Sequence, residues 1–241
     1  MGSPGRPTRR QRMRLAAIAE VKAAARDLLT DGGPSRISLR AIARTMGLTP
    51  AAIYRYFPSL DALVASLRSD LFDEVREFLE AARDRTPGGD ALARIGEMAR
   101  AFRRWSIDHP AEFGLLFGPP WPGMDAERAQ SGEGQDPRFR FAATFLAEFA
   151  SLWRQRPVNT PPICLIEERL GQHLGPYAAM HRDIPLPVLF LLLSAWTRLY
   201  GLVAMEVFGH MDWAITDAGI LFEMELHNFA SQLTGDQPAH W

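Results

Sequence analysis

Apolar residues recur three and four positions apart from the start of the first long segment of the chain. From Arg12 onward they fall on one helical stripe, while Arg14, Lys22 and Arg26 lie off it. This spacing is typical of an amphipathic helix with one face on a core. The glycines and proline of "TDGGPSR" are expected to end the helix. The stripe consists of Leu15, Ile18, Val21, Ala25, Leu28 and Leu29.

A different pattern over residues 37–57 predicts two short helices joined by a turn. Ser38 can cap a helix over 39–46, because its hydroxyl can accept a hydrogen bond from a backbone N–H of the first turn. Gly47 is well placed to end that helix, with Leu48 as the apolar residue that fixes the turn.

The second short helix is bounded as clearly as the first. Thr49 can cap it, and Pro50 occupies its first position, where a missing N–H costs nothing. The Phe57-Pro58 pair must end it after about two turns. Two helices joined by a four-residue turn that contains Gly form the pattern of a helix-turn-helix. In DNA-binding proteins the second helix of this motif lies in the major groove.

The run "IYRYF" leaves side chains outside the core. Ile53 and Phe57 are four apart and can face the preceding helices, which leaves Tyr54, Arg55 and Tyr56 on the outer face. Phenols and a guanidinium can donate to phosphate oxygens, and an arginine can reach a guanine edge. The alternatives are that the tyrosines pack on the rim of the first helix and that Arg55 is a solvated charge.

The charge of the chain is unevenly distributed. Its net charge is −1, but residues 1–60 hold eleven basic against three acidic residues, and the remainder is correspondingly acidic. Arg40, Arg44 and Arg55 lie on the two short helices, with no acid over residues 32–60. A basic head on an acidic body indicates a polyanion-binding module fused to another domain. The alternative is an inconsequential basic tail; residues 1–10 themselves are expected to be disordered.

The remainder of the chain is also predicted to be helical. Ser59 can cap a long helix with Leu63, Leu67, Leu71, Val75 and Phe78 on its buried stripe. No stretch alternates as a strand would, so the fold class is all-α. Residues 118–136, rich in Pro and Gly, are expected to form a loop. The further helices are expected at about 90–108, 110–117, 137–155, 163–181, 186–208 and 212–233.

The composition of the chain restricts the cellular compartment and the class of protein to be expected. One cysteine, Cys164, allows no internal disulfide, and the start of the chain has no apolar signal region. The most apolar run, residues 184–197, is shorter than the roughly 20 residues of a bilayer span. We therefore expect a cytoplasmic protein without membrane contact. No metal-ligand spacing, phosphate loop or nucleophile elbow occurs, so neither an enzyme nor a cofactor or metal is expected.

The stretch "ISLRAIARTMGLTPAAIYRYFPSLDALVAS" resembles the N-terminal domain of the TetR family of bacterial transcription regulators. The resemblance covers about residues 12–68 and includes the sequence G-L-T followed by Y-R-Y-F. It implies a three-helix DNA-binding domain, a connecting helix, and a helical body that binds a ligand and dimerises. The organisation is then a basic arm over 1–11, a DNA-binding domain over 12–58 and a ligand-binding and dimerisation domain over 59–241.

The resemblance also assigns roles to single residues. Thr49 would bond a phosphate, Pro50, Ala51 and Arg55 would face base edges, and Tyr54 and Tyr56 would hold the backbone. Leu60 stands where the family usually has a phosphate-binding lysine. A weaker likeness places "WTRLYGLVAMEVFGH" in the penultimate helix of a family subset with a W-x-x-L-H-G motif, where Tyr200 replaces the histidine. The expected partners are a palindromic duplex operator, a second copy of the chain and a small, largely apolar effector. The DNA-binding set is Arg40, Arg44, Thr49, Pro50, Ala51, Tyr54, Arg55 and Tyr56.

Two further sets follow for the body of the protein. Aromatic residues between the DNA-binding helices and the C-terminal helices are predicted to line the effector pocket, although each could be plain core. Apolar residues of the last two helices are predicted to form the dimer interface, although the run "VLFLLLSAW" could be core within one subunit. The alternative function is a helical, ligand-binding dimer without sequence-specific DNA binding. The pocket set is Trp105, Phe113, Phe117, Trp121, Phe141, Phe145, Phe149 and Trp153, and the interface set is Leu189, Leu192, Trp196, Ile220, Leu221 and Met224.

Overall fold

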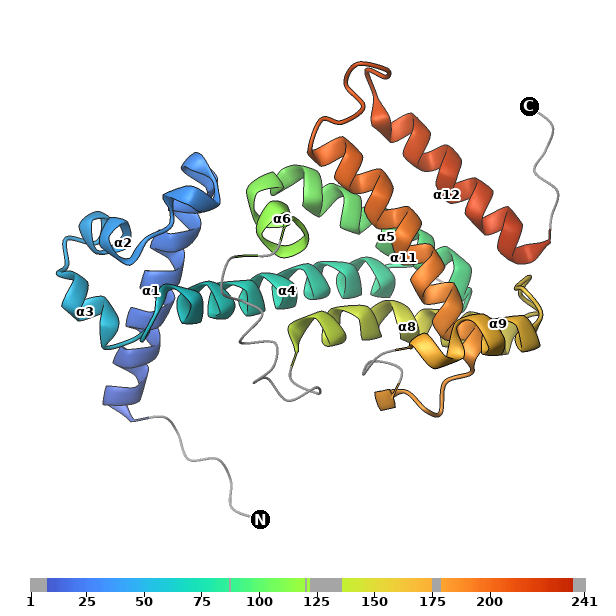
Figure 1. Ribbon diagram of the computed structural model, residues 1–241, viewed down its shortest axis with the longest axis horizontal. Helices are drawn as coiled ribbons and strands as arrows, with labels where there is room; N and C mark the ends of the chain where they lie inside the picture. Colours follow the sequence, from blue (N-terminus) through green and yellow to red (C-terminus); the bar gives the residue numbers. More distant parts are fainter. Residues whose placement is uncertain (1–7, 87, 120, 122–135, 175–178, 236–241) are drawn as a thin grey trace, which may run out of the picture. The chain divides into compact units, whose positions relative to one another are not determined.

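The computed structural model describes residues 8–86, 88–119, 121, 136–174 and 179–235, and within these ranges the chain contains helices and no strand. The predicted all-α fold is confirmed (Figure 1). Most of the loop expected over 118–136, and residues 1–7, lie outside the described residues. The α-helices are α1 (Arg9–Gly32), α2 (Leu39–Thr45), α3 (Pro50–Tyr54), α4 (Leu60–Asp84), α5 (Ala91–Asp108), α6 (Pro110–Phe117), α8 (Pro137–Gln155), α9 (Ile163–Arg169), α11 (Leu186–Val207) and α12 (Ala218–Thr234).

The chain divides into two compact units. The first contains residues up to Leu71 together with 111–130, and the second contains 72–110 together with the residues from Ser131 onward. The boundary falls inside α4, so the first half of this helix belongs to one unit and the second half to the other.

The first unit has a core shared by its three N-terminal helices. Val21, Ala25 and Leu29 of α1 are fully buried, as are Ile42 of α2 and Ile53 of α3. Helix α1 contacts α2, and α2 contacts α3. The apolar residues that the sequence pattern placed on the inner faces of these helices therefore form one common core, as the predicted helix-turn-helix requires.

Helix α1 begins earlier than the sequence pattern predicted. It starts at Arg9, so the expectation of disorder is wrong for residues 8–10. The reason is a capping box: the Gln11 N–H donates to Thr8 Oγ1 at 3.3 Å, and the Thr8 N–H donates to Gln11 Oε1 at 2.7 Å. Leu15, expected on the buried stripe, is 61% exposed, and the first buried residue of the helix is Val21.

Helix α4 follows the predicted pattern except near its end. The Ala62 N–H donates to Ser59 Oγ at 3.0 Å, as expected of an N-cap. The stripe from Leu63 through Val75 is buried, but Phe78 is 37% exposed. Leu79 is fully buried in its place, because the buried face continues in steps of four residues and Phe78 falls at its edge.

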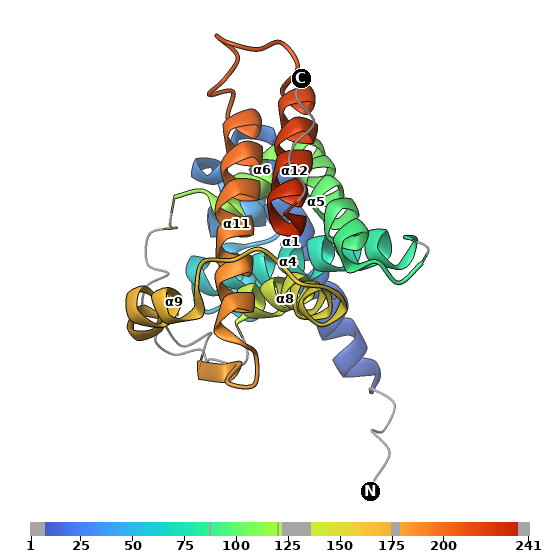
Figure 2. The same ribbon diagram turned by 90° about the vertical axis from the view of Figure 1, so that its right-hand side faces the viewer.

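The second unit is a helical bundle with an aromatic centre. Helix α5 packs on α8, and α11 packs on α5, α8, α9 and α12 (Figure 2). The ring centroids of Phe102 and Phe141 are 5.9 Å apart, and Trp196 lies 5.5 and 5.4 Å from them. These separations are those of favourable aromatic pairs.

Two C-terminal helices are shorter than predicted. Helix α9 ends at Arg169 and is followed by a single 3₁₀ turn, instead of continuing to residue 181. Helix α12 begins at Ala218 rather than 212, because the Asp217 carboxylate caps it by accepting from the Gly219 N–H at 2.9 Å. Gly209, with φ of 67°, lies in the connection from α11.

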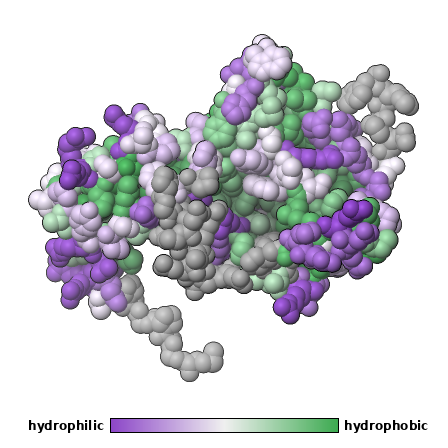
Figure 3. Space-filling view, in the orientation of Figure 1, coloured by the Kyte–Doolittle hydropathy of each residue, from purple (hydrophilic) through white to green (hydrophobic). Residues whose placement is uncertain are grey.

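Helix α11 is apolar well beyond its contacts within the chain. By length and composition it could cross a membrane, the one helix in the described part of the chain with this property. It packs in the bundle instead, yet only 33% of its most apolar window is buried. Most of the other residues of the helix are half-buried, and two of its large apolar side chains, Leu193 and Met205, are exposed. The face of the molecule in Figure 3 shows hydrophobic and hydrophilic residues side by side.

Candidate nucleic-acid interface and ligand pocket

The turn between α2 and α3 is a complete Schellman motif. The Leu48 N–H donates to the Ala43 carbonyl at 2.8 Å, and the Gly47 N–H donates to the Arg44 carbonyl at 3.2 Å. Gly47 has φ of 65°, a left-handed conformation that glycine adopts without strain. Leu48 itself is 42% exposed. The angle between α2 and α3 is therefore set by backbone hydrogen bonds more than by burial of Leu48.

Helix α3 presents the side chains that the sequence predicted on its outer face. Ile53 is fully buried and Phe57 is 6% exposed, so these two residues hold the helix on the core. Tyr54 is 56% exposed and Arg55 is exposed, whereas Tyr56 is half-buried. Packing on the rim of the domain therefore explains the partial burial of Tyr56, but it does not apply to Tyr54, which is exposed.

The other predicted DNA-binding residues are also accessible. Arg40 and Arg44 on α2 and Thr49, Pro50 and Ala51 at the start of α3 are all exposed. Thr49 occupies the N-cap position, but its hydroxyl makes no cap hydrogen bond, contrary to the capping role expected from the sequence. That hydroxyl can instead donate to a phosphate oxygen.

Three of the predicted pocket residues belong to the first unit. Phe113 is fully buried and pairs with Phe117, whose ring centroid is 5.2 Å away. The Trp121 Nε1–H donates to Asp61 Oδ1 at 3.2 Å. Phe113 is thus a core residue with no surface left for a ligand.

The other five predicted pocket residues belong to the second unit. Trp105 is 2% exposed, donates from Nε1 to Glu74 at 3.1 Å and stacks on His109. Phe141 is buried in the aromatic centre, and Trp153, near the end of α8, is half-buried. Trp105 and Phe141 are therefore core residues, as the alternative reading allowed.

A small apolar cavity lies elsewhere in the second unit, among α5, α8, α11 and α12. Its volume is about 50 Å³. Phe145 and Phe149 are the predicted pocket residues that line it, and Leu192 and Trp196 line it although they were predicted for the dimer interface. The apolar spacing of the three helices concerned was the signal for the remaining wall, which includes Ile95 and Ala99 of α5, Leu199 of α11, and Phe222, Leu226 and Phe229 of α12.

Two ionisable side chains complete the wall of this cavity. The Arg198 guanidinium lies 5.1 Å from the centroid of the Phe229 ring and donates to Gln232 Oε1 at 2.9 Å. Glu225 also contributes to the lining. A molecule that enters beside them meets an apolar interior with one cation and one carboxylate at its wall.

The predicted interface residues divide into buried and exposed sets. Leu189 and Leu192 are 4% and 7% exposed, so these two side chains are core within one chain, and their assignment to a dimer surface is corrected. The first half of α11 packs against neighbouring helices, which explains their burial. Trp196 and Leu221 are half-buried, and Ile220 is 61% exposed; Met224, one turn further along α12, is 40% exposed.

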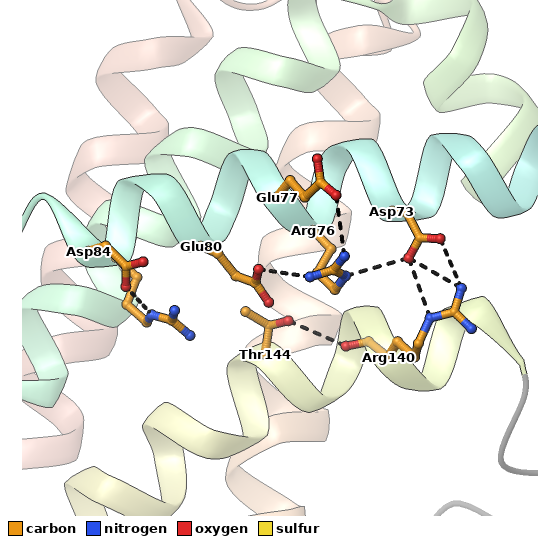
Figure 4. Close-up of polar contacts among 8 residues, drawn as sticks. Asp73, Arg76, Glu77, Glu80, Asp84, Arg140 and Thr144 are labelled. Carbon is orange, nitrogen blue, oxygen red and sulfur yellow. Dashed lines mark hydrogen bonds and ion pairs between the residues drawn. The ribbon is translucent and has the colours of Figure 1, made fainter. Parts of the chain in front are cut away.

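Charged residues tie the second half of α4 to α8 (Figure 4). Arg140 of α8 reaches Asp73 of α4 at 3.0 Å, and Arg76 lies 3.5 Å from the same carboxylate and 2.8 Å from Glu80. The hydrogen bond to Glu80 raises the pKa of Arg76 above its ordinary value, so the guanidinium keeps its charge. These contacts connect the connecting helix to the helix that carries Phe145 and Phe149.

Two family descriptions match this arrangement. "Bacterial regulatory proteins, tetR family" matches residues 22–67, and "Tetracyclin repressor-like, C-terminal domain" matches residues 95–229, which is more than half of the chain. The chain belongs to the TetR family of helix-turn-helix transcriptional regulators, whose members are not enzymes.

Individual proteins agree with the family. The HTH-type transcriptional regulator Rv1816 of Mycobacterium tuberculosis (strain ATCC 25618 / H37Rv) is 28% identical over 213 residues, covering 86% of this chain and 88% of the relative. The crystal structure of the candidate regulatory protein SCO4313 is 29% identical, covers 92% of this chain and 98% of its own, and superposes with a TM-score of 0.71. A TetR family regulator from Marinobacter aquaeolei VT8, at 16% identity, 92% and 98% coverage and a TM-score of 0.59, shares the fold.

Proposed function

We propose that this chain is a repressor that binds a palindromic operator as a homodimer and is released by a small, largely apolar effector. The observation that carries the proposal is the outer face of α3, where Tyr54 and Arg55 are exposed while Ile53 and Phe57 are buried. A five-residue helix held in this way offers its polar face to a groove and keeps its apolar face on the protein.

The chemistry of that face suits duplex DNA. Arg55 can donate two hydrogen bonds to a guanine edge, which supplies base discrimination. Tyr54, Thr49, Arg40 and Arg44 can donate to phosphates and fix the register of the helix. In the described part of the chain, no carboxylate pairs with these three arginines.

Two copies of the chain are needed to read a palindrome. Exposed apolar residues of the last two helices support such a pairing, because large apolar patches on a soluble chain mark association sites. On a two-fold axis, the two α3 helices would meet half-sites roughly 34–36 Å apart, about one turn of DNA. The exposed apolar set comprises Leu193, Met205, Phe208, Ile220 and Met224.

The effector is proposed to enter the second unit at the cavity lined by Phe145, Phe149 and Trp196. The cavity of about 50 Å³ is well below the roughly 300–1,000 Å³ of ligand sites, so binding must widen it. Helix α8 carries both phenylalanines and the ion pair from Arg140 to α4, which provides a connection through which widening can tilt α4. A hundredfold preference of the ligand for the tilted state corresponds to about 2.7 kcal/mol of coupling.

Selection of bound duplexes from a random oligonucleotide pool tests the DNA-binding step. The expected result is an enriched palindrome, bound roughly 5- to 160-fold more weakly by Arg55→Ala, since a bidentate base contact is worth about 1–3 kcal/mol. Arg104→Ala is the matched control, because Arg104 is an exposed arginine of the second unit. An enriched motif that Arg55→Ala binds unchanged would refute the role of α3, and no enrichment would favour a ligand-binding dimer that does not read sequence.

The enriched duplex then provides the assay for the effector. A library of small apolar and aromatic molecules is added to the complex, and release is followed by fluorescence anisotropy. Leu199 lines the cavity, and Leu199→Trp places a larger side chain there that fills part of its volume. The variant is expected to respond more weakly to an active molecule, while its affinity for DNA without that molecule stays the same. Equal sensitivity of both proteins would place the effector outside this cavity.

A further inference from the structure

The first two turns of α1 make no contact with the core. Every residue from 9 to 16 is exposed, and the first buried residue of the helix is Val21. Twelve residues separate Arg9 from Val21, which at 1.5 Å per residue is about 18 Å of helix. Figure 1 shows these turns extending away from α2 and α3.

This extension carries an unusual concentration of positive charge. Arg9, Arg10, Arg12 and Arg14 fall within six residues, and the first turn of the helix contains no acid. Positive charge at a helix N-terminus opposes the helix dipole, and arginines four apart, such as Arg10 and Arg14, repel each other. Each effect destabilises the helix by some tenths of a kcal/mol, and the capping box at Thr8 works against them.

Three of these four arginines have no acidic partner within the described part of the chain. No described carboxylate forms an ion pair with Arg9, Arg10 or Arg14. By contrast, Lys22 and Arg26 further along α1 are paired with Asp70 and Glu112. Arg9, Arg10 and Arg14 are therefore arranged for an anion supplied from outside the chain.

We propose that residues 9–16 form a second DNA-binding surface, which holds the phosphate backbone beside the bases read by α3. The surface lies in the same compact unit as Arg40, Arg44 and Arg55, so a single polyanion can meet both sets. Duplex DNA carries one charge per 1.7 Å of axis, and residues 9–16, which are about 12 Å of helix, therefore span several phosphates. The inference adds to the proposed DNA binding but does not depend on base recognition or on an operator.

The energetics follow from counterion release. Each arginine that neutralises a phosphate steepens the decline of log affinity with log salt by about 0.9. Neutralisation also removes the repulsion within the extension, so its helix becomes more stable in the complex. Because phosphates carry no base identity, the added affinity is the same for any sequence.

The test is the salt dependence of duplex binding by the full-length chain with Arg9, Arg10 and Arg14 all changed to Gln. We expect the log–log slope to become shallower by up to about 2.7, equivalent to about 40-fold less loss of affinity between roughly 50 and 200 mM salt. The expected change is equal on random and on enriched duplex. The corresponding triple change to Lys keeps the charge and should retain most of the slope.

A matched control removes the same charge elsewhere. Arg85, Arg104 and Arg154 are exposed residues of the second unit, and changing all three to Gln should leave the slope unchanged. An equal loss of slope in this control, or an unchanged slope in the Arg9, Arg10 and Arg14 variant, would overturn the proposal. Thermal melting checks that both variants fold; residues 9–16 lie outside the core, so the melting temperature should stay the same.

Further outcomes separate this inference from the proposed function. If the wild-type chain enriches no motif but the slope on random duplex still falls in the variant, the extension binds DNA although operator recognition fails. Vesicles of phosphatidylglycerol and phosphatidylcholine are the parallel probe. Capture of the wild-type chain by these vesicles, lost in the variant while the duplex slope is unchanged, would assign the arginines to a membrane surface and overturn the proposal.

Discussion

At the scale of single residues, the most constrained polar group outside the DNA-binding face is Glu112 of α6. Its side chain is 3% exposed, and Oε1 accepts from Arg26 Nε at 2.9 Å, whereas Oε2 is buried with no hydrogen-bond partner among the residues that the structure describes. A charge held in this way depends strongly on its counterion. Arg26 therefore serves to neutralise Glu112 and to fix α1 on α6.

Arg26→Met should accordingly destabilise the protein by about 3 kcal/mol, because it leaves a buried charge without its partner. The double change Arg26→Met with Glu112→Leu should recover most of this loss, since both charges are then gone. Urea unfolding of the four proteins forms a double-mutant cycle that measures the coupling. A double variant as unstable as the sum of the two singles would show that the ion pair is not the cause.

The outward direction of Tyr54 and Arg55 could be predicted from the sequence. Whether an individual aromatic residue lies in the core or lines the cavity could not. Two buried residues four apart, Ile53 and Phe57, fix the face of a short helix and leave the positions between them outside. Trp105 and Phe141 became core because of packing between helices distant in sequence, which no local pattern encodes. Apolar composition alone does not distinguish a core wall from a cavity wall.

At the scale of helices, the extension of α1 should behave independently of the core. Thr8→Ala removes the capping box and should weaken the first turns by about 1 kcal/mol. Because residues 9–16 have no core contacts, the global melting temperature should not change. Amide hydrogen exchange should accelerate at residues 11–15 and stay the same beyond Val21; faster exchange throughout α1 would contradict this independence.

Helices α5 and α12 are joined by a pair whose strength depends on pH. The hydrogen bond from Arg100 lowers the pKa of Glu223 below its ordinary value of 4.5. A folded pKa below the unfolded one gives stabilisation that is complete above the ordinary value and is lost as the pH falls through the folded value. Because both side chains are partly exposed, the pair contributes less than about 1 kcal/mol.

Glu223→Gln should thus lower stability at neutral pH and make almost no difference once the pH is below the folded pKa of Glu223. Urea midpoints measured across this range for the wild type and the variant test the sign. Glu167→Gln on α9 is the control, because its carboxylate is exposed and forms no ion pair among the described residues. A deficit that grows on acidification would exclude the pair as its source.

The type and order of the helices could be predicted, but their ends depended on local hydrogen bonds. Ser38 and Ser59 cap as expected, because the residue types are strong N-caps next to apolar runs. The early start of α1 depended on Thr8 and Gln11 acting together, a signal present in the sequence but hidden within a polar, proline-rich segment. The late start of α12 depended on the cap at Asp217, whereas the expectation of a helix over 212–233 considered no cap.

At the scale of the whole molecule, pairing of two chains is the expectation that most needs a direct measurement. Ile220→Asp with Met224→Asp places two charges on the exposed apolar face of α12. Burial of unpaired charge costs several kcal/mol, so the dissociation constant of a dimer formed through this face should rise at least about 100-fold. Sedimentation equilibrium over a range of concentrations measures the change.

Ile163→Asp on α9 is the matched control, because Ile163 is 55% exposed on a helix outside the proposed interface. It should leave the dimer intact. If the α12 variant loses the dimer, it should also lose binding to a two-half-site duplex while keeping weak binding to a single half-site. A dimer indifferent to the α12 changes would move the interface elsewhere.

The separation of the α1 extension from the core has a consequence for how this protein can diverge. Substitutions in residues 9–16 alter charge without disturbing any packed side chain, so they are nearly neutral for folding. Under the proposed role of this segment, natural selection can adjust the strength of DNA binding in small steps, while α3 and the helices that support it stay unchanged. Related proteins that recognise the same DNA motif could therefore differ in their residence time on it through substitutions in residues 9–16 alone.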